Sequence, residues 1–319
     1  IAVANNFENI STKFVTGSGA AKILKNLDFK VEDIYIPPQF IVENGMLKNS
    51  TRWLWNYYQY YKRCKKSAKK IIDVDSPRLV ISDEDFASLT VAQNKKIPTI
   101  LITDIVQTNF VNGITSFIEK KMNKSMQEIM KKCDTVIIPE NGPDEGNIRR
   151  VGPIVRQTNF SREELRKKFS FDKKTIVISV GGTDAGLFLI EKTLESISKI
   201  NQDVNVIVVS GPSLSKKFGD HIRNLGFVSN LHEIIFAADV IVSLAGKSTI
   251  DEARAYGTPG IFIPIKGHFE QEDNAREEGF VFEDINKLDK LILEKLEQKR
   301  NPLETKGAIN AYNIIKKLI

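Results

Sequence analysis

The stretch ADVIVSLAGKSTIDEA, residues 238–253, decides the fold class. Its apolar run ends at Ser243, small residues follow, and a helical pattern begins near Lys247. A strand that leads through a turn of small residues into a helix is the repeating element of α/β sheets. The first turn of such a helix carries partial positive charge and unpaired N–H groups, which bind phosphate. The stretch therefore predicts an α/β fold with an anion-binding turn.

The same stretch excludes one nucleotide-binding class and suggests another. Gly246-Lys247-Ser248 is not a Walker loop, because Ile241 stands where that motif requires glycine. Glu252 falls about one turn into the helix, where a carboxylate can accept hydrogen bonds from a ribose diol. A glutamate on a solvated helix face is the alternative interpretation.

A second turn of this kind lies upstream. The run IVISV at 176–180 leads into GGTDAG at 181–186 and then into a helical segment. Glycines let a phosphate approach the backbone, although a tight turn without function is equally consistent with this pattern alone. Two helix N-termini side by side would suit the two phosphates of a nucleoside diphosphate.

Apolar runs alternate with helical patterns along both halves of the chain, which predicts two Rossmann-like domains with parallel sheets flanked by helices. In the second half we expect six strands, the third and sixth of them at 225–228 and 280–282. A capping box at Ser161 and Glu164 marks a helix near the junction. The expected division is an N-terminal domain at 1–155, a C-terminal domain at 156–302 and a last helix at 303–319 that crosses back to the first domain.

The composition limits the number of domains, the compartment and the partners that the sequence suggests. With 319 residues, 41% of them hydrophobic, the chain suits two domains and contains no apolar run long enough to span a membrane. Two distant cysteines imply neither a disulfide framework nor a zinc site, which favours a reducing compartment. A net charge of +6 favours anionic partners. Because the chain starts with Ile1 in an apparent helix, we expect further sequence upstream.

A polar loop at 266–275 follows the apolar run at 260–265 and contains Glu270 and Gln271, which can hydrogen-bond sugar hydroxyls. The order of these motifs resembles the C-terminal half of glycosyltransferase family 28, the family of MurG, over roughly 151–275. The resemblance implies a GT-B fold, in which two Rossmann-like domains face each other, and a UDP-sugar donor. It implies donor-binding roles for Arg156, Gly181, Gly182, Thr183, Gly226, Phe227, Val228, Ala245, Gly246, Lys247, Ser248, Thr249, Glu252, Glu270 and Gln271.

Within that set, the resemblance places the diphosphate on the two turns with Arg156 reaching it from the linker. It places the ribose on Glu252, the uracil on the backbone of 226–228, and the sugar on Glu270 and Gln271. Family members commonly have two glutamines at the last pair, so Glu270 leaves the identity of the sugar open. No metal is expected, because the donor half shows no Asp-x-Asp pair.

Catalytic residues are harder to place, because the family's Gly-rich loop with its histidine would lie upstream of Ile1. The candidates are Asp83 and Asp104, which follow expected strands of the first half, and His268 beside the sugar loop. Helix capping is the alternative role of Asp83.

The segment at 53–70 combines aromatic residues with six basic ones. Residues 53, 54, 57, 58 and 61 share a helical face typical of core packing, whereas Trp55 and Tyr60 lie off it. Contact with an anionic membrane is one function of such a segment, and nucleic-acid binding is not indicated.

The sequence therefore predicts a glycosyltransferase that moves a sugar, GlcNAc or a related one, from a UDP-sugar to an acceptor that could be lipid-linked. We expect it in the cytoplasm or on the inner face of the membrane. The alternatives are a UDP-sugar hydrolase or 2-epimerase of the same fold, and a non-catalytic subunit that binds nucleotide sugars.

Overall fold

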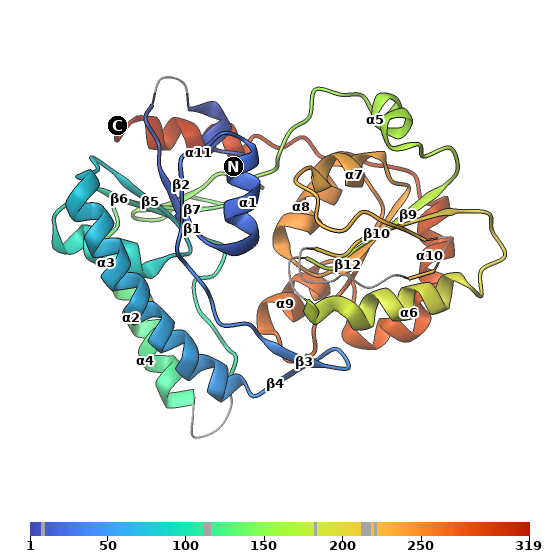
Figure 1. The fold of residues 1–319 in the computed structure, drawn as a ribbon, viewed down its shortest axis with the longest axis horizontal. Coiled ribbons are helices and arrows are strands. Elements are labelled where there is room, and N and C mark those ends of the chain that lie inside the picture. The colour runs from blue at the N-terminus through green and yellow to red at the C-terminus, as the bar shows by residue number, and fades with distance from the viewer. Residues whose placement is uncertain (8–9, 112–115, 182–183, 212–217, 220–221) are drawn as a thin grey trace. The chain divides into compact units, whose positions relative to one another are not determined.

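The computed structural model describes residues 1–7, 10–111, 116–181, 184–211, 218–219 and 222–319. These residues fall into two compact units (Figure 1). The first unit comprises Ile1–Gln39, Asn49–Ile154 and Thr305–Ile319, and the second comprises Phe40–Lys48 and Val155–Glu304. In each unit, parallel strands are flanked by helices, which confirms the predicted fold class. No described helix is both long and apolar enough to cross a membrane.

The first unit is built on a four-stranded parallel sheet of order β5-β6-β7-β8 beside a two-stranded pair, β1-β2. The strands are β1 (Phe14–Thr16), β2 (Val31–Asp33), β5 (Val80–Asp83), β6 (Thr99–Ile102), β7 (Thr135–Ile138) and β8 (Ile148–Arg150). The helices are η1 (Ala4–Asn6), α1 (Ser18–Asn26), α2 (Ser50–Asp75), α3 (Phe86–Asn94), α4 (Ser116–Lys131) and α11 (Gly307–Lys316).

Helix α11, the last element of the chain, packs on the first unit. Ala311 and Ile315 are fully buried in one cluster with Ile100 of β6 and Ile137 of β7. The helix begins at Gly307, where a Cβ would lie only 2.2 Å from the carbonyl oxygen of Pro153, so only glycine permits this approach. The apolar face of α11 thus completes the core of a domain whose other elements lie far upstream.

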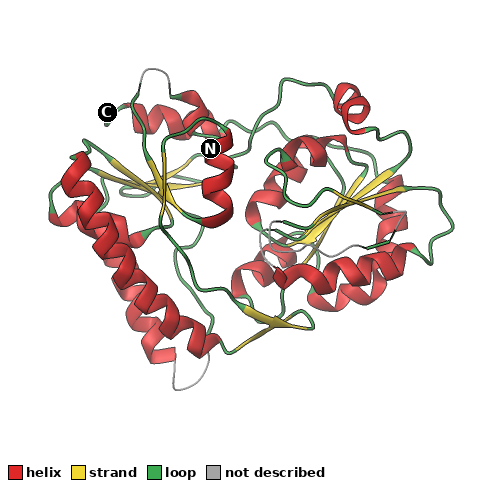
Figure 2. Cartoon of the chain, viewed as in Figure 1, coloured by secondary structure: helices red, strands yellow, loops and turns green. Residues whose placement is uncertain are grey.

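The second unit contains a five-stranded parallel sheet of order β11-β10-β9-β12-β13 among the described residues. The strands are β9 (Thr175–Ser179), β10 (Asn205–Val209), β11 (Arg223–Asn224), β12 (Val240–Leu244) and β13 (Gly260–Ile263). The helices are α5 (Arg162–Phe169), η3 (Asp184–Gly186), α6 (Leu187–Ile197), α7 (Leu231–Ala237), α8 (Lys247–Tyr256), α9 (Phe269–Glu277), η4 (Phe282–Lys287) and α10 (Leu288–Glu297). Helices cover both faces of the sheet (Figure 2), so β9 and β12 are buried along their whole length.

Two of the six strands expected in the second half are not strands in the structure. Residues 225–228 follow β11 as a turn, because Gly226 has φ +59° and donates its N–H to the side chain of Asn224. Residues 280–282 lead directly into η4. Both segments are apolar because they pack on the core of the second unit, not because they extend its sheet.

The hairpin of β3 (Ile41–Glu43) and β4 (Met46–Lys48) departs from the expected division at residue 155. It groups with the second unit, although the chain on either side of it belongs to the first. Val42 and Leu47 pack against the core of the second unit, and the Leu47 N–H donates to the carbonyl oxygen of Lys266 at 2.8 Å. The physical reason for the difference is this long-range pairing, which sequence periodicity does not record.

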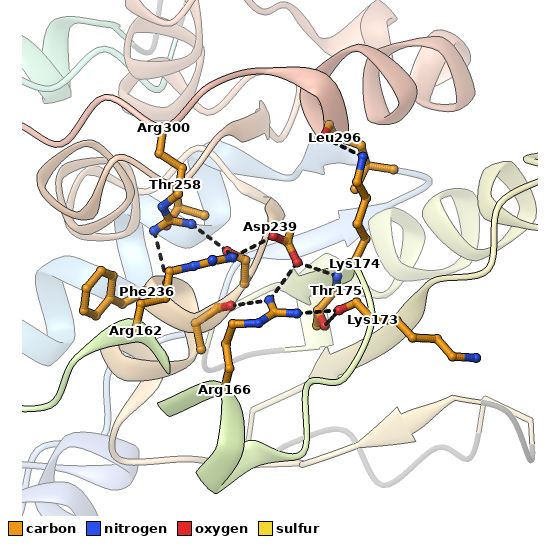
Figure 3. Close-up of polar contacts among 12 residues, drawn as sticks. Arg162, Arg166, Lys173, Lys174, Thr175, Phe236, Asp239, Thr258, Leu296 and Arg300 are labelled. Atoms are coloured by element: carbon orange, nitrogen blue, oxygen red, sulfur yellow. Dashed lines mark hydrogen bonds and ion pairs between the residues drawn. The ribbon is translucent and has the colours of Figure 1, made fainter. Parts of the chain in front are cut away.

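A polar network anchors α5 at the amino ends of β9 and β12 (Figure 3). Asp239 accepts hydrogen bonds from Arg162 at 2.6 Å, from Arg166 at 2.8 Å and from the backbone N–H of Thr175 at 2.8 Å. Burial raises the pKa of Asp239, but these hydrogen bonds and charges outweigh it and hold that pKa below its usual range. Arg300 donates to the carbonyl oxygens of residues 236, 238 and 256. The network lies at the sheet edge opposite the glycine turns, and its role is structural.

Candidate functional site

The order of strands in the second unit defines where a ligand would bind. From β9 the chain adds β10 and β11 on one side, and it then returns to place β12 and β13 on the other. Strands β9 and β12 are therefore the point at which the order reverses, with Ser179 paired beside Ser243. Open α/β sheets bind ligands outside the carboxyl ends of their strands at such a point. Both glycine turns expected from the sequence follow these two strands.

The turn after β12 leads through Ala245 and Gly246 into α8, which begins at Lys247 as the sequence predicts. Gly246 is the N-cap and makes no side-chain capping bond. The Thr249 N–H donates to the carbonyl oxygen of Gly246 at 3.1 Å, and the N–H groups of Lys247 and Ser248 precede it at the helix end. No described atom lies within 4 Å of a Cβ placed on Gly246, which leaves room beside the turn. Ser248 and Thr249 lie in this first turn, and the arrangement suits a phosphate group.

Lys247 adds a cation beside the turn. Its side chain is 14% exposed, and its Nζ lies 3.6 Å from Oδ1 of the buried Asp251 one turn along α8. The pair holds the ammonium group close to the helix N-terminus, where it adds to the positive end of the helix dipole.

The turn after β9 is described only in part. Gly181 has φ +78°, a conformation that glycine adopts without strain, and no described atom lies within 4 Å of a Cβ placed on it. Gly182 and Thr183 lie outside the described residues. The chain then passes through η3 before α6 begins at Leu187 with Gly186 as its N-cap.

Glu252 and Arg156 contact each other in the structure. The Arg156 Nε donates to Glu252 Oε1 at 2.8 Å, and its Nη2 donates to Oε2 at 3.4 Å. A third bond runs from Arg156 Nη1 to the carbonyl oxygen of Ser229, and the Tyr256 hydroxyl donates to the carbonyl oxygen of Arg156. Burial raises the pKa of the Glu252 carboxyl, and the Arg156 guanidinium opposes that rise. Arg156 thus orients the carboxylate that we expected at the ribose.

The loop after β13 is organised by hydrogen bonds to its backbone. The side-chain oxygen of Gln271 accepts from the N–H of Ile265 at 3.0 Å. This bond fixes the orientation of the amide, with its NH2 group turned away from Ile265. Glu270 is half-buried in the first turn of α9. His268 is the N-cap residue of α9 and is 7% exposed, and burial lowers its pKa to about 4, so its imidazole is neutral at physiological pH.

Two asparagines that the sequence did not single out shape the same edge. Asn274 donates to the carbonyl oxygen of Ala245 at 3.1 Å and so ties α9 to the turn after β12. Its spacing from Gln271, almost one helical turn, was the signal available in the sequence. Asn224 accepts from Ser210 and from the N–H of Gly226, which fixes the turn that carries Phe227 and Val228. Phe227 and Val228 are both half-buried.

Asp83 and Asp104 belong to the first unit. Asp83 ends β5 and pairs with Ile102 of the neighbouring strand, two residues before Asp104. Burial raises the pKa of Asp83, and the nearby charge of Asp104 raises it further. The alternative role of Asp83 as a helix cap is wrong, because Asp85 caps α3 by accepting from the N–H groups of Ala87 and Ser88. Asp83 and Asp104 are therefore neighbours at the carboxyl edge of the first unit's sheet.

No group of three or more His, Cys, Asp or Glu residues in the described part of the chain is arranged to hold a metal ion.

Residues 175–316 match the model of the glycosyltransferase family 28 C-terminal domain. Over these residues the chain is similar to the family 28 C-terminal domain. The family resemblance is thus confirmed over the residues that contain β9, β12 and Glu252. The match begins with β9 and extends through the sheet of the second unit into α11.

Relatives that align with more of the chain are also named as transferases of sugars. An uncharacterized glycosyltransferase of Methanosarcina acetivorans is 30% identical over 66% of this chain and 61% of its own length. A UDP-N-acetylglucosamine–N-acetylmuramyl-(pentapeptide) pyrophosphoryl-undecaprenol N-acetylglucosamine transferase of Caldicellulosiruptor saccharolyticus is 27% identical over 86% of this chain and 77% of its own length. The chain spans 61–62% of the length of the first three relatives.

The solved structure of the glycotransferase of kitacinnamycin has the same fold, with a TM-score of 0.63 over 100% of this chain and 93% of its own. Its sequence is 11% identical, so this likeness concerns the fold alone. The GT-B type of fold expected from the sequence is confirmed in both units.

Proposed function

We propose that this chain is a family 28 glycosyltransferase that takes its sugar from a UDP-sugar bound at the carboxyl edge of the second unit. The observation that carries the proposal is the strand reversal between β9 and β12, with a glycine turn after each strand and Glu252 one turn into α8. The turns would hold the two phosphates and Glu252 the ribose diol. Backbone groups of 226–228 would read the uracil, and Glu270 and Gln271 the sugar.

In this proposal the protein itself stabilises the leaving group. When the glycosidic bond to the donor breaks, negative charge develops on the departing UDP. The N-terminus of α8 and the ammonium group of Lys247 lie at the proposed diphosphate site and would stabilise that charge without a metal ion. The catalytic base that accepts the proton of the acceptor hydroxyl is proposed among Asp83, Asp104 and His268.

The proposed acceptor is a lipid-linked molecule, and α2 is the proposed contact with an anionic membrane. Trp55 is 60% exposed and Tyr58 46% exposed, and the ammonium group of Lys62 lies 4.4 Å above the Tyr58 ring. Tyr58 was expected in the core stripe, whereas Tyr60, expected off it, packs against Tyr35. An exposed aromatic pair followed by basic residues suits the interface of an anionic bilayer. We place the protein on the cytoplasmic side of such a membrane.

The test begins with ligand binding and continues to products. UDP and UDP-sugars should raise the melting temperature more than GDP, ADP or NAD do, because the backbone of 226–228 is proposed to read the uracil. A ligand at 100 times its dissociation constant adds about 2.7 kcal/mol of stability. Equal shifts for all nucleotides would contradict the uracil assignment. Incubation of UDP-N-acetylglucosamine with lipid-linked acceptors should release UDP only when an acceptor is present. Free sugar without acceptor would identify a hydrolase, an epimerised sugar a 2-epimerase, and tight binding without any turnover a non-catalytic subunit.

A further inference from the structure

The hairpin of β3 and β4 is joined to the loop after β13 by backbone hydrogen bonds. The Leu47 N–H donates to the carbonyl oxygen of Lys266 at 2.8 Å, and the Lys266 N–H donates to the carbonyl oxygen of Gly45 at 2.9 Å. These two bonds make Met46 and Lys266 a parallel bridge. In Figure 1 the hairpin accordingly lies beside α9. The loop that carries the proposed sugar contacts thus gains a strand partner from the other end of the sequence.

Side chains fix the hairpin in this place. Val42 and Leu47 pack on the core of the second unit. Gly45 has φ +76°, and a Cβ on it would come within 2.7 Å of ring carbons of Phe188 and Phe282. Phe188 is the second residue of α6, which follows the glycine turn after β9, and β3 also contacts η3. The hairpin is therefore packed against the elements that follow two of the proposed donor-binding strands.

The ring of Phe40, directly before β3, meets the imidazole of His268 edge to face, with centroids 5.0 Å apart and an interplanar angle of 66°. His268 ends the loop and is the N-cap residue of α9. The aromatic contact thus reaches the residue that immediately precedes the helix bearing Glu270 and Gln271.

The hydrogen bonds around Lys266 connect the hairpin to those side chains. The N–H of Ile265, one residue before Lys266, donates to Gln271 at 3.0 Å, and the N–H of Gly267, one residue after it, donates to Glu272 at 2.9 Å. Displacement of Lys266 would move both of these N–H groups. The orientation of the Gln271 amide consequently depends on a hairpin that contributes no residue to α9.

We infer that the hairpin, with Phe40 at its start, is a positioning element of the sugar subsite: it holds the loop at 264–268 so that Gln271 and Glu270 meet the donor sugar. This inference rests on the proposed function. It assigns Phe40 a role in binding the sugar and none in binding the nucleotide, because the Phe40 ring contacts His268 in the loop after β13, whereas the contacts of the hairpin with η3 and α6 come from β3 and Gly45.

The test compares the dissociation constants of UDP, UDP-N-acetylglucosamine and UDP-glucose by calorimetry on the full chain. Since small misplacements of positioning groups cost up to 100-fold in enzymes, we expect Phe40→Ala to weaken the better-bound UDP-sugar about tenfold. UDP itself should stay within about twofold of the wild type. Phe40→Tyr keeps the aromatic contact and should restore the ratio of UDP-sugar to UDP affinity. Phe29→Ala is the matched control, because Phe14 and Phe29 form a similar edge-on pair in the first unit, with centroids 4.9 Å apart.

Hydrogen exchange provides a readout that needs no ligand. Phe40→Ala and Gly45→Ala should both speed the exchange of the Leu47 and Lys266 amides, while the amides of β9 and β12 stay protected. If the wild type bound none of the three nucleotides, the proposed function would fail and the sugar-positioning role with it. If it bound them and Phe40→Ala changed UDP and the UDP-sugars equally, or changed neither, the role of the hairpin would be refuted and the proposed function would stand.

Discussion

The ion pair of Arg156 with Glu252 offers the sharpest test of how the candidate site is held. Arg156→Met removes the guanidinium while keeping an unbranched side chain, and it leaves the Glu252 carboxylate without the two hydrogen bonds it now accepts. Glu252→Gln removes the other charge. Together with the double variant, these changes form a cycle that isolates the coupling between the two residues.

The solvent exposure of the two side chains determines how large a loss of stability we expect. The Glu252 side chain is 7% exposed and the Arg156 side chain is 23% exposed. Leaving one partner of a fully buried pair unpaired costs about 3–5 kcal/mol, but water reaches the guanidinium here. We therefore expect Arg156→Met to lower the free energy of unfolding of the second unit by about 2–3 kcal/mol. The control Arg276→Met breaks a pair whose partners are 69% and 62% exposed, and it should cost about 0–0.5 kcal/mol.

The loss should also depend on pH in a defined direction. Burial already raises the pKa of Glu252, and removal of Arg156 raises it further. Between the unfolded pKa, about 4.3, and the raised native value, the native state keeps a proton that the unfolded state has lost. Stability in Arg156→Met should therefore fall as pH rises through this window, and the deficit relative to the wild type should be largest above it.

The assay must report on the second unit alone. Trp53 and Trp55, the two tryptophans of the chain, lie in the first unit, so intrinsic tryptophan fluorescence follows the wrong part of the protein. Native-state hydrogen exchange at the amides of β9 and β12 measures the opening of the second unit directly. If the double variant lost the plain sum of the two single losses, within about 0.5 kcal/mol, the pair would be uncoupled and the reasoning refuted.

Three further predictions concern the ribose contact, the network around Asp239 and helix α11. In calorimetry we expect the wild type to prefer UDP over 2′-deoxyuridine diphosphate by about 1.5–3 kcal/mol, and Glu252→Gln should abolish this preference. If the preference survived, Glu252 would not bind the ribose. Asp239→Asn should cost the second unit about 2–4 kcal/mol at pH 7. Because the native pKa of Asp239 is lowered, this difference should begin to shrink as pH falls below about 4 and should vanish only below the native pKa; a difference that stayed unchanged at the lowest pH would contradict the network's charge. Ile315→Ala should lower the free energy of unfolding of the first unit, followed by tryptophan fluorescence, by about 2–5 kcal/mol. The control Leu318→Ala, at a position 37% exposed, should change it little. Equal effects would mean that α11 is not part of that core.

Local chemistry explains what could be predicted from the sequence. The capping box at Ser161 forms as expected, with Glu164 Oε2 accepting from the Ser161 N–H at 2.8 Å, because both partners lie within one helical turn. The start of α8 at Lys247 also follows from neighbouring residues alone. Apolar runs identified the inner strands because these strands are buried on both faces. By contrast, residues 225–228 and 280–282 are apolar for packing in loops, and the pattern does not separate the two causes.

The hairpin was missed for a different reason. Asn44-Gly45 is the strongest short-range hairpin signal, and the structure gives both residues positive φ, 48° and 76°. The turn could therefore have been predicted. Its docking could not, because the partners of Gly45 and Leu47 are the backbone of Lys266 and rings of the second unit, which local periodicity does not encode.

Arg156 shows how a site residue can be recognised while its contact is not. Its position at the junction suggested a contact with the diphosphate, whereas the structure gives it the Glu252 carboxylate and the carbonyl oxygen of Ser229. The Tyr256 hydroxyl holds the Arg156 carbonyl at 2.7 Å, so the backbone is fixed and only the side chain can change partner. A ribose diol at Glu252 would have to share the carboxylate with Arg156 or replace it there. In the second case the released guanidinium would become available to the diphosphate, and binding of the ribose and of the phosphates would be coupled through one arginine.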